Sequence, residues 1–291
     1  MTDRRSTRAR VALAWLAAAL ITAPSVCHGA TKPALAGTNS RMAREDAVRA
    51  IPITKLDQSL SAKVQRVVAS PSIFRRLPVQ VIDCDPKMYH FLLNNPEVIV
   101  NIWQVMGISK VQMVRTGATS FEASDGSGAA GTVHVAYSDH DTQVVYCEGV
   151  YNGPMFPKPI RAQCVLLIKA GYVQETNGRY FVTTRCDSFI HLDNVGFELL
   201  ARTFQPMVNK SADVNFVETA NFVAMVSRTS ERKPTGMSKL GNRLQNVTPE
   251  VRAAFITTAQ QVAQRSERNR TIVQTDARST PQQQLPTTVR R

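Results

Sequence analysis

The residues best suited to chemistry stand in two short clusters. The first is residues 138–141, Ser-Asp-His-Asp, which brings two carboxylates and an imidazole together in the sequence. Such ligands can hold a divalent metal, yet serine and aspartate are also common turn residues. The segment separates two stretches of alternating residues, so we predict a turn there and no metal site.

The second cluster is Asp83-Cys84-Asp85, at the end of a β-like run. Pro86 follows Asp85, and this order is typical of a helix N-cap and the first helical position. We therefore interpret Asp85 as a cap. The alternative is a catalytic or metal-binding triplet.

Several other side chains could transfer protons if they faced an apolar cavity, where burial raises the pKa of a carboxyl group. They are His134, His191, Glu122, Glu148 and Glu198. A histidine on a strand is more often packed or hydrogen-bonded, and Glu198 near a helix start suits the helix dipole whatever its function. Glu148 is opposite in parity to Cys147 and should point to the other face of the sheet. We assign no catalytic residue.

The motifs of the common enzyme classes are absent from the sequence. There is no nucleophile elbow, P-loop, dinucleotide fingerprint or His-Glu-x-x-His, and no Cys-x-x-Cys pair. This argues against a common hydrolase, kinase or dehydrogenase, and we expect no cofactor.

The elements that would position these residues begin after an aperiodic, polar segment at 31–54, which we interpret as a linker. Residues 55–70 have helical spacing of apolar residues, and residues 78–83 alternate as a strand. Two short helices then start at Pro86 and Pro96, and the second should end at Gly107.

From residue 110 the period of the sequence changes to two, which predicts strands. They are expected at 110–117, 119–125, 131–138, 142–152, 160–173 and 179–192. The connecting segments are short, and Asn177-Gly178 is a strong hairpin signal, so we predict an antiparallel meander. In the fifth strand Ile160, Ala162, Cys164, Leu166 and Ile168 should face the core. Arg161, Gln163 and Lys169 should face water.

The C-terminal part is expected to be helical in two places. A long helix should cover about 195–228, where Pro206 either kinks it or splits it in two. A linker and then a helix at about 248–268 should follow, with a disordered end from about residue 271.

This order of elements resembles the helix-grip fold of the START-like superfamily, which includes polyketide cyclases and lipid-transfer domains. The resemblance covers about residues 72–228 and rests on element order, with no signature motif. It implies an α+β fold in which a curved antiparallel sheet of about seven strands wraps the C-terminal helix. An apolar cavity would lie between the sheet and the helix from about Val195 to Arg228.

By this resemblance, large or apolar side chains of the helices and strands would line the cavity, although plain core packing is the alternative for each. We name Trp103, Met106, Met113, Val145, Leu166, Phe197, Phe204, Met207 and Phe216 as cavity residues.

Four cysteines remain if Cys27 leaves with an N-terminal signal. They either form disulfides or stay buried thiols. The loop centred near residues 155–156 places Cys147 roughly opposite Cys164, so these two form the preferred disulfide if one exists.

The net charge of +13 is concentrated at the two ends of the chain. Residues 1–30 carry +3 and residues 230–291 carry +7, while residues 31–229 carry only +3. Four arginines followed by the apolar run at 11–26 are typical of an export signal, and an uncleaved N-terminal anchor is the alternative. The middle of the chain is nearly balanced, so we predict no nucleic-acid partner.

The sequence thus divides into an export signal at 1–36, a linker and amphipathic helix at 37–71, a START-like domain at 72–229 and a basic tail at 230–291. We expect an exported, non-enzymatic protein that binds a lipid or other apolar small molecule. One alternative is a cyclase- or aromatase-type enzyme that uses the same cavity. The other is an interaction protein of the cell envelope with a filled core, whose basic tail contacts an anionic surface.

Overall fold

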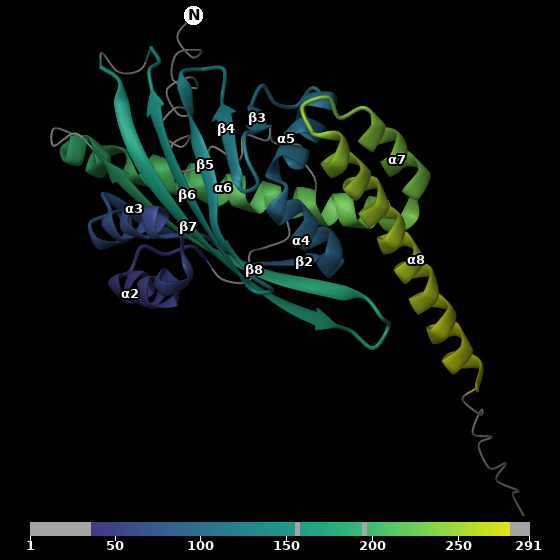
Figure 1. The fold of residues 1–291 in the computed structure, drawn as a ribbon. Coiled ribbons are helices and arrows are strands. Elements are labelled where there is room, and N and C mark those ends of the chain that lie inside the picture. Colours follow the sequence, from purple (N-terminus) through teal and green to yellow (C-terminus); the bar gives the residue numbers. More distant parts are fainter. Residues whose placement is uncertain (1–35, 155–157, 194–196, 280–291) are drawn as a thin grey trace, which may run out of the picture.

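A single curved sheet of eight antiparallel strands dominates the fold (Figure 1). The computed structural model describes residues 36–154, 158–193 and 197–279. The strands are β1 (Ile73–Arg76), β2 (Gln80–Asp83), β3 (Gln112–Arg115), β4 (Ser120–Ser124), β5 (Ala129–Ser138), β6 (Thr142–Tyr151), β7 (Ile160–Gln174) and β8 (Tyr180–Leu192). The strand order is β1-β8-β7-β6-β5-β4-β3, so the meander predicted from residue 110 onward is confirmed.

One edge of the sheet carries two short strands, β1 and β2, which both pair with β8. Only the second of them was predicted from the sequence. Between them the Leu77 amide still donates to the Cys186 carbonyl at 2.8 Å. Pro78 has no amide hydrogen and so cannot continue the ladder. The edge therefore breaks at Pro78, and the sheet has eight strands where about seven were expected.

Two short helices follow this edge, as predicted: α4 (Pro86–Asn94) and α5 (Pro96–Val105). The Asp85 carboxylate accepts a hydrogen bond from the Lys87 amide at 2.8 Å, which confirms it as the N-cap of α4. Gly107 has φ +70°, as expected for the residue that ends α5.

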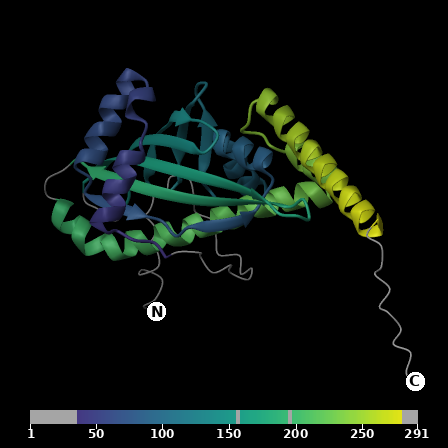
Figure 2. The ribbon, with the colours of Figure 1, turned by 90° about the horizontal axis from the view of Figure 1, so that it is seen from below.

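The long helix is α6 (Phe197–Arg232), which continues through Pro206 as one element. It lies along one face of the sheet (Figures 1 and 2). The linker expected after residue 228 is wrong: α6 extends to Arg232, and α7 (Pro234–Asn242) follows. The last helix, α8 (Pro249–Ser279), extends beyond the predicted end at 268 and the expected start of disorder at 271.

These C-terminal helices belong to the main core. Met237, Leu244, Phe255 and Val262 are buried in the same hydrophobic cluster as the inner face of the sheet. The burial of α7 was not predicted, because its apolar residues are few and separated by polar ones.

The opposite face of the sheet is covered by N-terminal helices. The linker expected at 31–54 is wrong, because residues 41–50 form α2 (Arg41–Ala50), followed by the short 3₁₀ helix η1 (Ile53–Lys55) and α3 (Gln58–Ala69). The Ser40 side chain caps α2. Buried residues of α2 and α3 pack on outward-facing residues of β6, β7 and β8 in a second core, which comprises Ala43, Ala47, Ile51, Leu56, Val64, Val67, Val68, Phe74, Val144, Tyr146, Val165, Leu167 and Phe189.

Among the described residues, no helix is both long and apolar enough to span a bilayer. The apolar run at 11–26 lies outside the described residues.

Candidate ligand cavity

A cavity of about 140 Å³ lies between the inner face of the sheet and α6. The strands β5 to β8 supply one wall, α6 supplies the opposite wall, and α4 and α5 close the side. Most lining side chains are apolar, among them Leu92, Ile99, Val133, Ile168 and Val223. The cavity is thus an apolar space inside the main core.

The cavity-lining positions on α6 show why space remains there. Ala212, Thr219 and Ala220 face the sheet, and Ser188 faces them from β8. These are small side chains, and a core position that carries a small side chain leaves volume unless its neighbours collapse into it.

Three of the residues named from the sequence line this cavity: Val145, Leu166 and Phe216. Trp103 is fully buried and packs on the Phe222 ring, with centroids 5.4 Å apart, outside the lining. Met113 is likewise buried core.

Of the remaining named residues, only Met106 has a described side chain. Met106 is 52% exposed and points away from the core. The side chains of Phe197, Phe204 and Met207 lie outside the described part of the chain.

A few polar groups face the apolar space, and the sequence reasoning did not find them. The hydroxyls of Tyr89 and Thr184 are hydrogen-bonded to each other at 2.9 Å and are buried. The Ser188 hydroxyl lies 4.0 Å from the Cys164 sulfur, a weak contact. The available signal was the alternation on β8, which puts Thr184, Cys186 and Ser188 on one face.

The titratable groups that line the cavity are uncharged at neutral pH. Burial raises the pKa of Tyr89, and hydrogen bonding to Thr184 only partly offsets it. Burial also raises the pKa of the Cys186 thiol. The described lining contains no Asp, Glu, His, Lys or Arg side chain.

The proposed acid–base residues that can be placed lie away from the cavity. Glu148 is on the outer face, where its carboxylate accepts hydrogen bonds from Lys63 at 3.1 Å and Tyr146 at 2.8 Å. Burial opposes ionisation of Glu148, but these partners outweigh it and lower its pKa. His134 lies near Tyr146 on the same outer face, with ring centroids 6.5 Å apart.

The other candidates have no cavity contact either. His191 Nδ1 lies 2.8 Å from the Ser70 carbonyl oxygen, so it joins β8 to the end of α3. Glu122 is exposed on β4, and the side chain of Glu198 lies outside the described residues.

The Asp83-Cys84-Asp85 cluster holds elements together. Asp83 forms ion pairs with Arg179 and, at 3.2 Å, with Arg228 of α6. Asp85 pairs with Arg265 of α8 at 3.0 Å. Cys84 is fully buried, and burial raises the pKa of its thiol far above the usual range. The two carboxylates therefore join the edge strand to the C-terminal helices.

The Ser138–Asp141 segment is a turn, as predicted. Asp139 accepts hydrogen bonds from the Tyr137 hydroxyl and from the Asp141 and Thr142 amides, and these lower its pKa to about 2. Asp141 pairs with Lys169 at 3.2 Å. In the described chain, no group of three His, Cys, Asp or Glu side chains is arranged to hold a metal ion.

Cys147 and Cys164 are directly opposite in the β6–β7 register, as the sequence suggested. In the structure, these two and Cys84 and Cys186 are free, buried thiols. The second alternative, buried thiols that pack as small apolar residues, therefore describes the structure.

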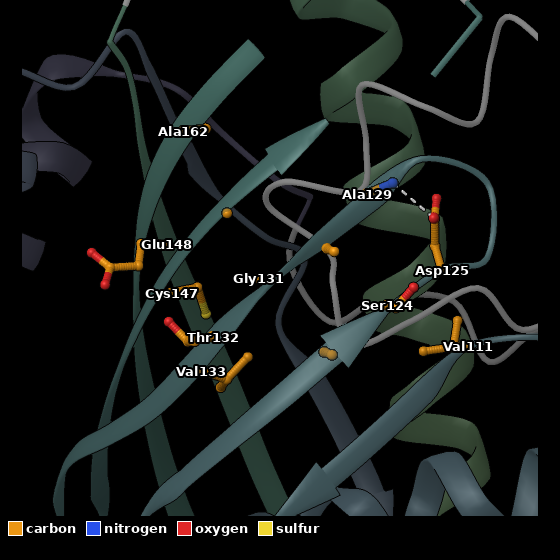
Figure 3. Close-up of a pocket in the computed structure, with 13 residues that line it drawn as sticks. Val111, Ser124, Asp125, Ala129, Gly131, Thr132, Val133, Cys147, Glu148 and Ala162 are labelled. Carbon is orange, nitrogen blue, oxygen red and sulfur yellow. Dashed lines mark hydrogen bonds between the residues drawn. The ribbon is translucent and has the colours of Figure 1, made fainter. Parts of the chain in front are cut away.

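A second, much smaller hollow of about 30 Å³ lies where β5 and β6 approach each other (Figure 3). Gly131 and Gly149 are opposite in the register, and a Cβ on Gly131 would lie only 2.3 Å from the Glu148 carbonyl oxygen. Figure 3 shows Glu148 pointing away from Cys147, and Asp125 accepting the Ala129 amide. A space of this size holds about one water molecule, so we do not consider it a ligand site.

Beside the large cavity, His90 of α4 packs on the rings of His140 and Tyr172, each with a centroid distance of 5.3 Å. Burial, and then the neighbouring His140, lower the pKa of His90 below 6.5. The neutral ring is therefore the folded form, and the stability it contributes is present above about pH 6.5 and is lost as the pH falls below that value.

We expect the His90→Phe variant to lose less stability than the wild type between pH 7.5 and 5.5. Urea unfolding at both pH values measures this difference. An equal loss in both proteins would contradict the assignment, and His191→Phe serves as a control on the other face of the sheet.

The comparisons with family models and with curated proteins gave no match. Among solved structures, "Crystal structure of apo Dicamba Monooxygenase" superposes with a TM-score of 0.25 and 9% identity, covering 72% of this chain and 60% of that one. The chain thus spans less than two thirds of that structure.

Proposed function

We propose that this protein binds a small apolar molecule in the cavity between the sheet and α6. The observation that carries the proposal is the cavity itself, about 140 Å³ with a mainly apolar lining. An engineered apolar cavity of about 150 Å³ in another protein stays dry and binds benzene or xenon. The size favours a ring-sized ligand over a membrane lipid with long acyl chains.

We also propose that the arrangement is a helix grip. The support is that β1 and β2 pair one after the other with the same edge of β8, and that α4 and α5 lie between β2 and β3 in sequence. In addition, α6 lies along the inner face of the sheet (Figures 1 and 2). In this view the cavity is the space held between the sheet and its long helix. The apolar run at 11–26 supports placing this binding protein outside the cytoplasm.

Two observations favour binding over the alternatives. The acid–base candidates His134, Glu148 and His191 lie on the outer side of the sheet and not in the cavity, which supports binding over a cyclase-type reaction. A purely structural protein would have a filled core, whereas this core contains a cavity.

Native mass spectrometry of the purified protein, before and after organic extraction, tests the proposal. We expect a discrete bound mass that extraction removes. Ala220 is 5% exposed and lines the cavity, so Ala220→Phe should occupy the space and abolish the bound mass.

The matched control is Met225→Phe on the same helix, because Met225 is 44% exposed and lies outside the cavity lining. It should leave the bound mass unchanged. An apo mass that stays unliganded when the protein is incubated with toluene would overturn the proposal.

A further inference from the structure

Most of the cavity lining is apolar, and a pair of hydroxyls lies on its β8 wall. Thr184, Cys186 and Ser188 face inward from β8, and Tyr89 reaches the same wall from α4. Gln143 of β6 and Asn215 and Thr219 of α6 also line the space. The Gln143 amide already donates to the Leu93 carbonyl at 3.1 Å, and the Thr219 hydroxyl donates to the Asn215 carbonyl at 2.9 Å. A ligand in this space would therefore be mainly apolar and would meet a hydroxyl pair at the β8 wall.

The Tyr89–Thr184 pair has hydrogen-bonding capacity left over. Two hydroxyls separated by 2.9 Å use one O–H in their mutual bond. The other O–H and the remaining lone pairs are available to a further partner, because each hydroxyl is one donor and two acceptor sites. Both residues are buried, at 5% and 3% exposure, so bulk water does not supply these partners freely.

The composition of the cavity lining also limits the charge that a ligand can carry. The described lining has no cationic side chain to pair with an anion and no carboxylate to pair with a cation. Transfer of an unpaired charge into an apolar space is far more costly than transfer of a hydrogen-bonded neutral group. A carboxylate ligand, such as a fatty acid anion, is therefore disfavoured.

We propose that the cavity selects a neutral, ring-sized molecule with one hydroxyl or carbonyl group, and that the Tyr89–Thr184 hydroxyl pair recognises this group. The inference rests on the proposed function, because it presupposes that the cavity is occupied. It adds the chemical class of the ligand and the atoms that orient it.

Titration of the full chain with toluene, phenol and benzoate tests the inference. The three probes share one ring and differ in having no polar group, a neutral hydroxyl or an anion. We expect toluene and phenol to bind and benzoate to bind at least tenfold more weakly than phenol. Tyr89→Phe should weaken phenol about three- to tenfold, the equivalent of one neutral hydrogen bond, and leave toluene within twofold.

Two variants complete the design. Thr184→Val should repeat the selective loss of phenol, since it removes the other member of the pair, and it gives an independent test if Tyr89→Phe fails to fold. Tyr172→Phe is the control, because the Tyr172 hydroxyl donates to the His140 carbonyl at 2.8 Å and does not line the cavity.

The outcomes separate the two proposals. Failure of both toluene and phenol to bind the wild type would overturn the proposed function and this inference with it. Toluene binding with phenol affinity unchanged in Tyr89→Phe and Thr184→Val would overturn the inference alone. Benzoate binding as tightly as phenol would overturn the requirement for a neutral ligand.

Discussion

Replacement of Asp187 by alanine is expected to destabilise the protein by about 3–5 kcal/mol, the usual cost of removing one partner of a buried ion pair. Asp187 on β8 is fully buried, and its Oδ1 lies 2.5 Å from Nε of Arg76 on β1. The Arg76 side chain is only 16% exposed and also contacts Asp46 and the Ala43 carbonyl oxygen of α2. Loss of Asp187 would leave the Arg76 charge buried beside a single, half-exposed carboxylate.

Urea unfolding at neutral pH measures this effect. Asp141→Ala is the matched control, because Asp141 forms an exposed ion pair with Lys169 at 3.2 Å, and such pairs contribute about 0–1 kcal/mol. A double variant, Arg76→Leu with Asp187→Leu, should recover part of the loss, since the Arg76 charge is removed together with its partner. Arg185, which also pairs with Asp187 at 3.3 Å, keeps Asp46 as a partner at 3.6 Å. Equal destabilisation by Asp187→Ala and Asp141→Ala would show that the buried pair is not important.

The parts of the fold that the sequence predicted correctly are governed by local chemistry. Asp85 followed by Pro86 caps α4, Gly107 takes the positive φ that ends α5, and Gly178 takes φ +79° in the hairpin. The strands from residue 110 onward follow from period-two alternation and short turns. Each of these signals lies within a few residues of the feature it determines.

The sequence analysis did not predict that helices cover both faces of the sheet, although the sequence of β7 indicates it. Arg161, Gln163 and Lys169 suggested that the second face of β7 meets water. Val165 and Leu167 lie between them on that face and are fully buried. A nearly continuous apolar run is typical of a strand that is buried on both faces, and Cys164–Ile168 is such a run. The helix that covers it is α3, which the sequence predicted at 55–70 without indicating where it packs. The second covering helix, α2, contacts β1 and was missed because its own sequence is only weakly apolar.

Side-chain size was a poor criterion for two of the predicted cavity residues. Trp103 and Met113 were chosen because they are large, and both are fully buried in the core outside the cavity lining. A cavity forms where side chains are too short to meet, and so Ala212, Ala220 and Ser188 line it. The positions of these small residues relative to one another depend on the crossing of α6 over the sheet, which the sequence does not specify.

Truncation at the predicted domain boundary should have the largest effect of all. A chain that starts at residue 72 lacks α2 and α3 and would expose the outer core, including Val144, Val165, Leu167 and Phe189, which are fully buried. On the helices, Ile51, Leu56, Val64, Val67 and Val68 are buried against it. Burial of each large aliphatic side chain contributes about 1.5–3 kcal/mol, and the total net stability of a domain is about 5–15 kcal/mol. We therefore expect the truncated chain to be insoluble or to lack cooperative unfolding.

The control is a chain that starts at residue 37, which keeps both helices. It should be soluble and unfold cooperatively, as followed by circular dichroism during heating. If the chain from residue 72 melted at the same temperature as the chain from residue 37, the outer core would be dispensable and the rest of the chain would fold without α2 and α3. The structure argues otherwise, because Arg76, at the start of the shorter chain, lies between Asp187 of the sheet and Asp46 of the removed helix. Truncation thus removes a charged partner and an apolar cover from the same face of the sheet.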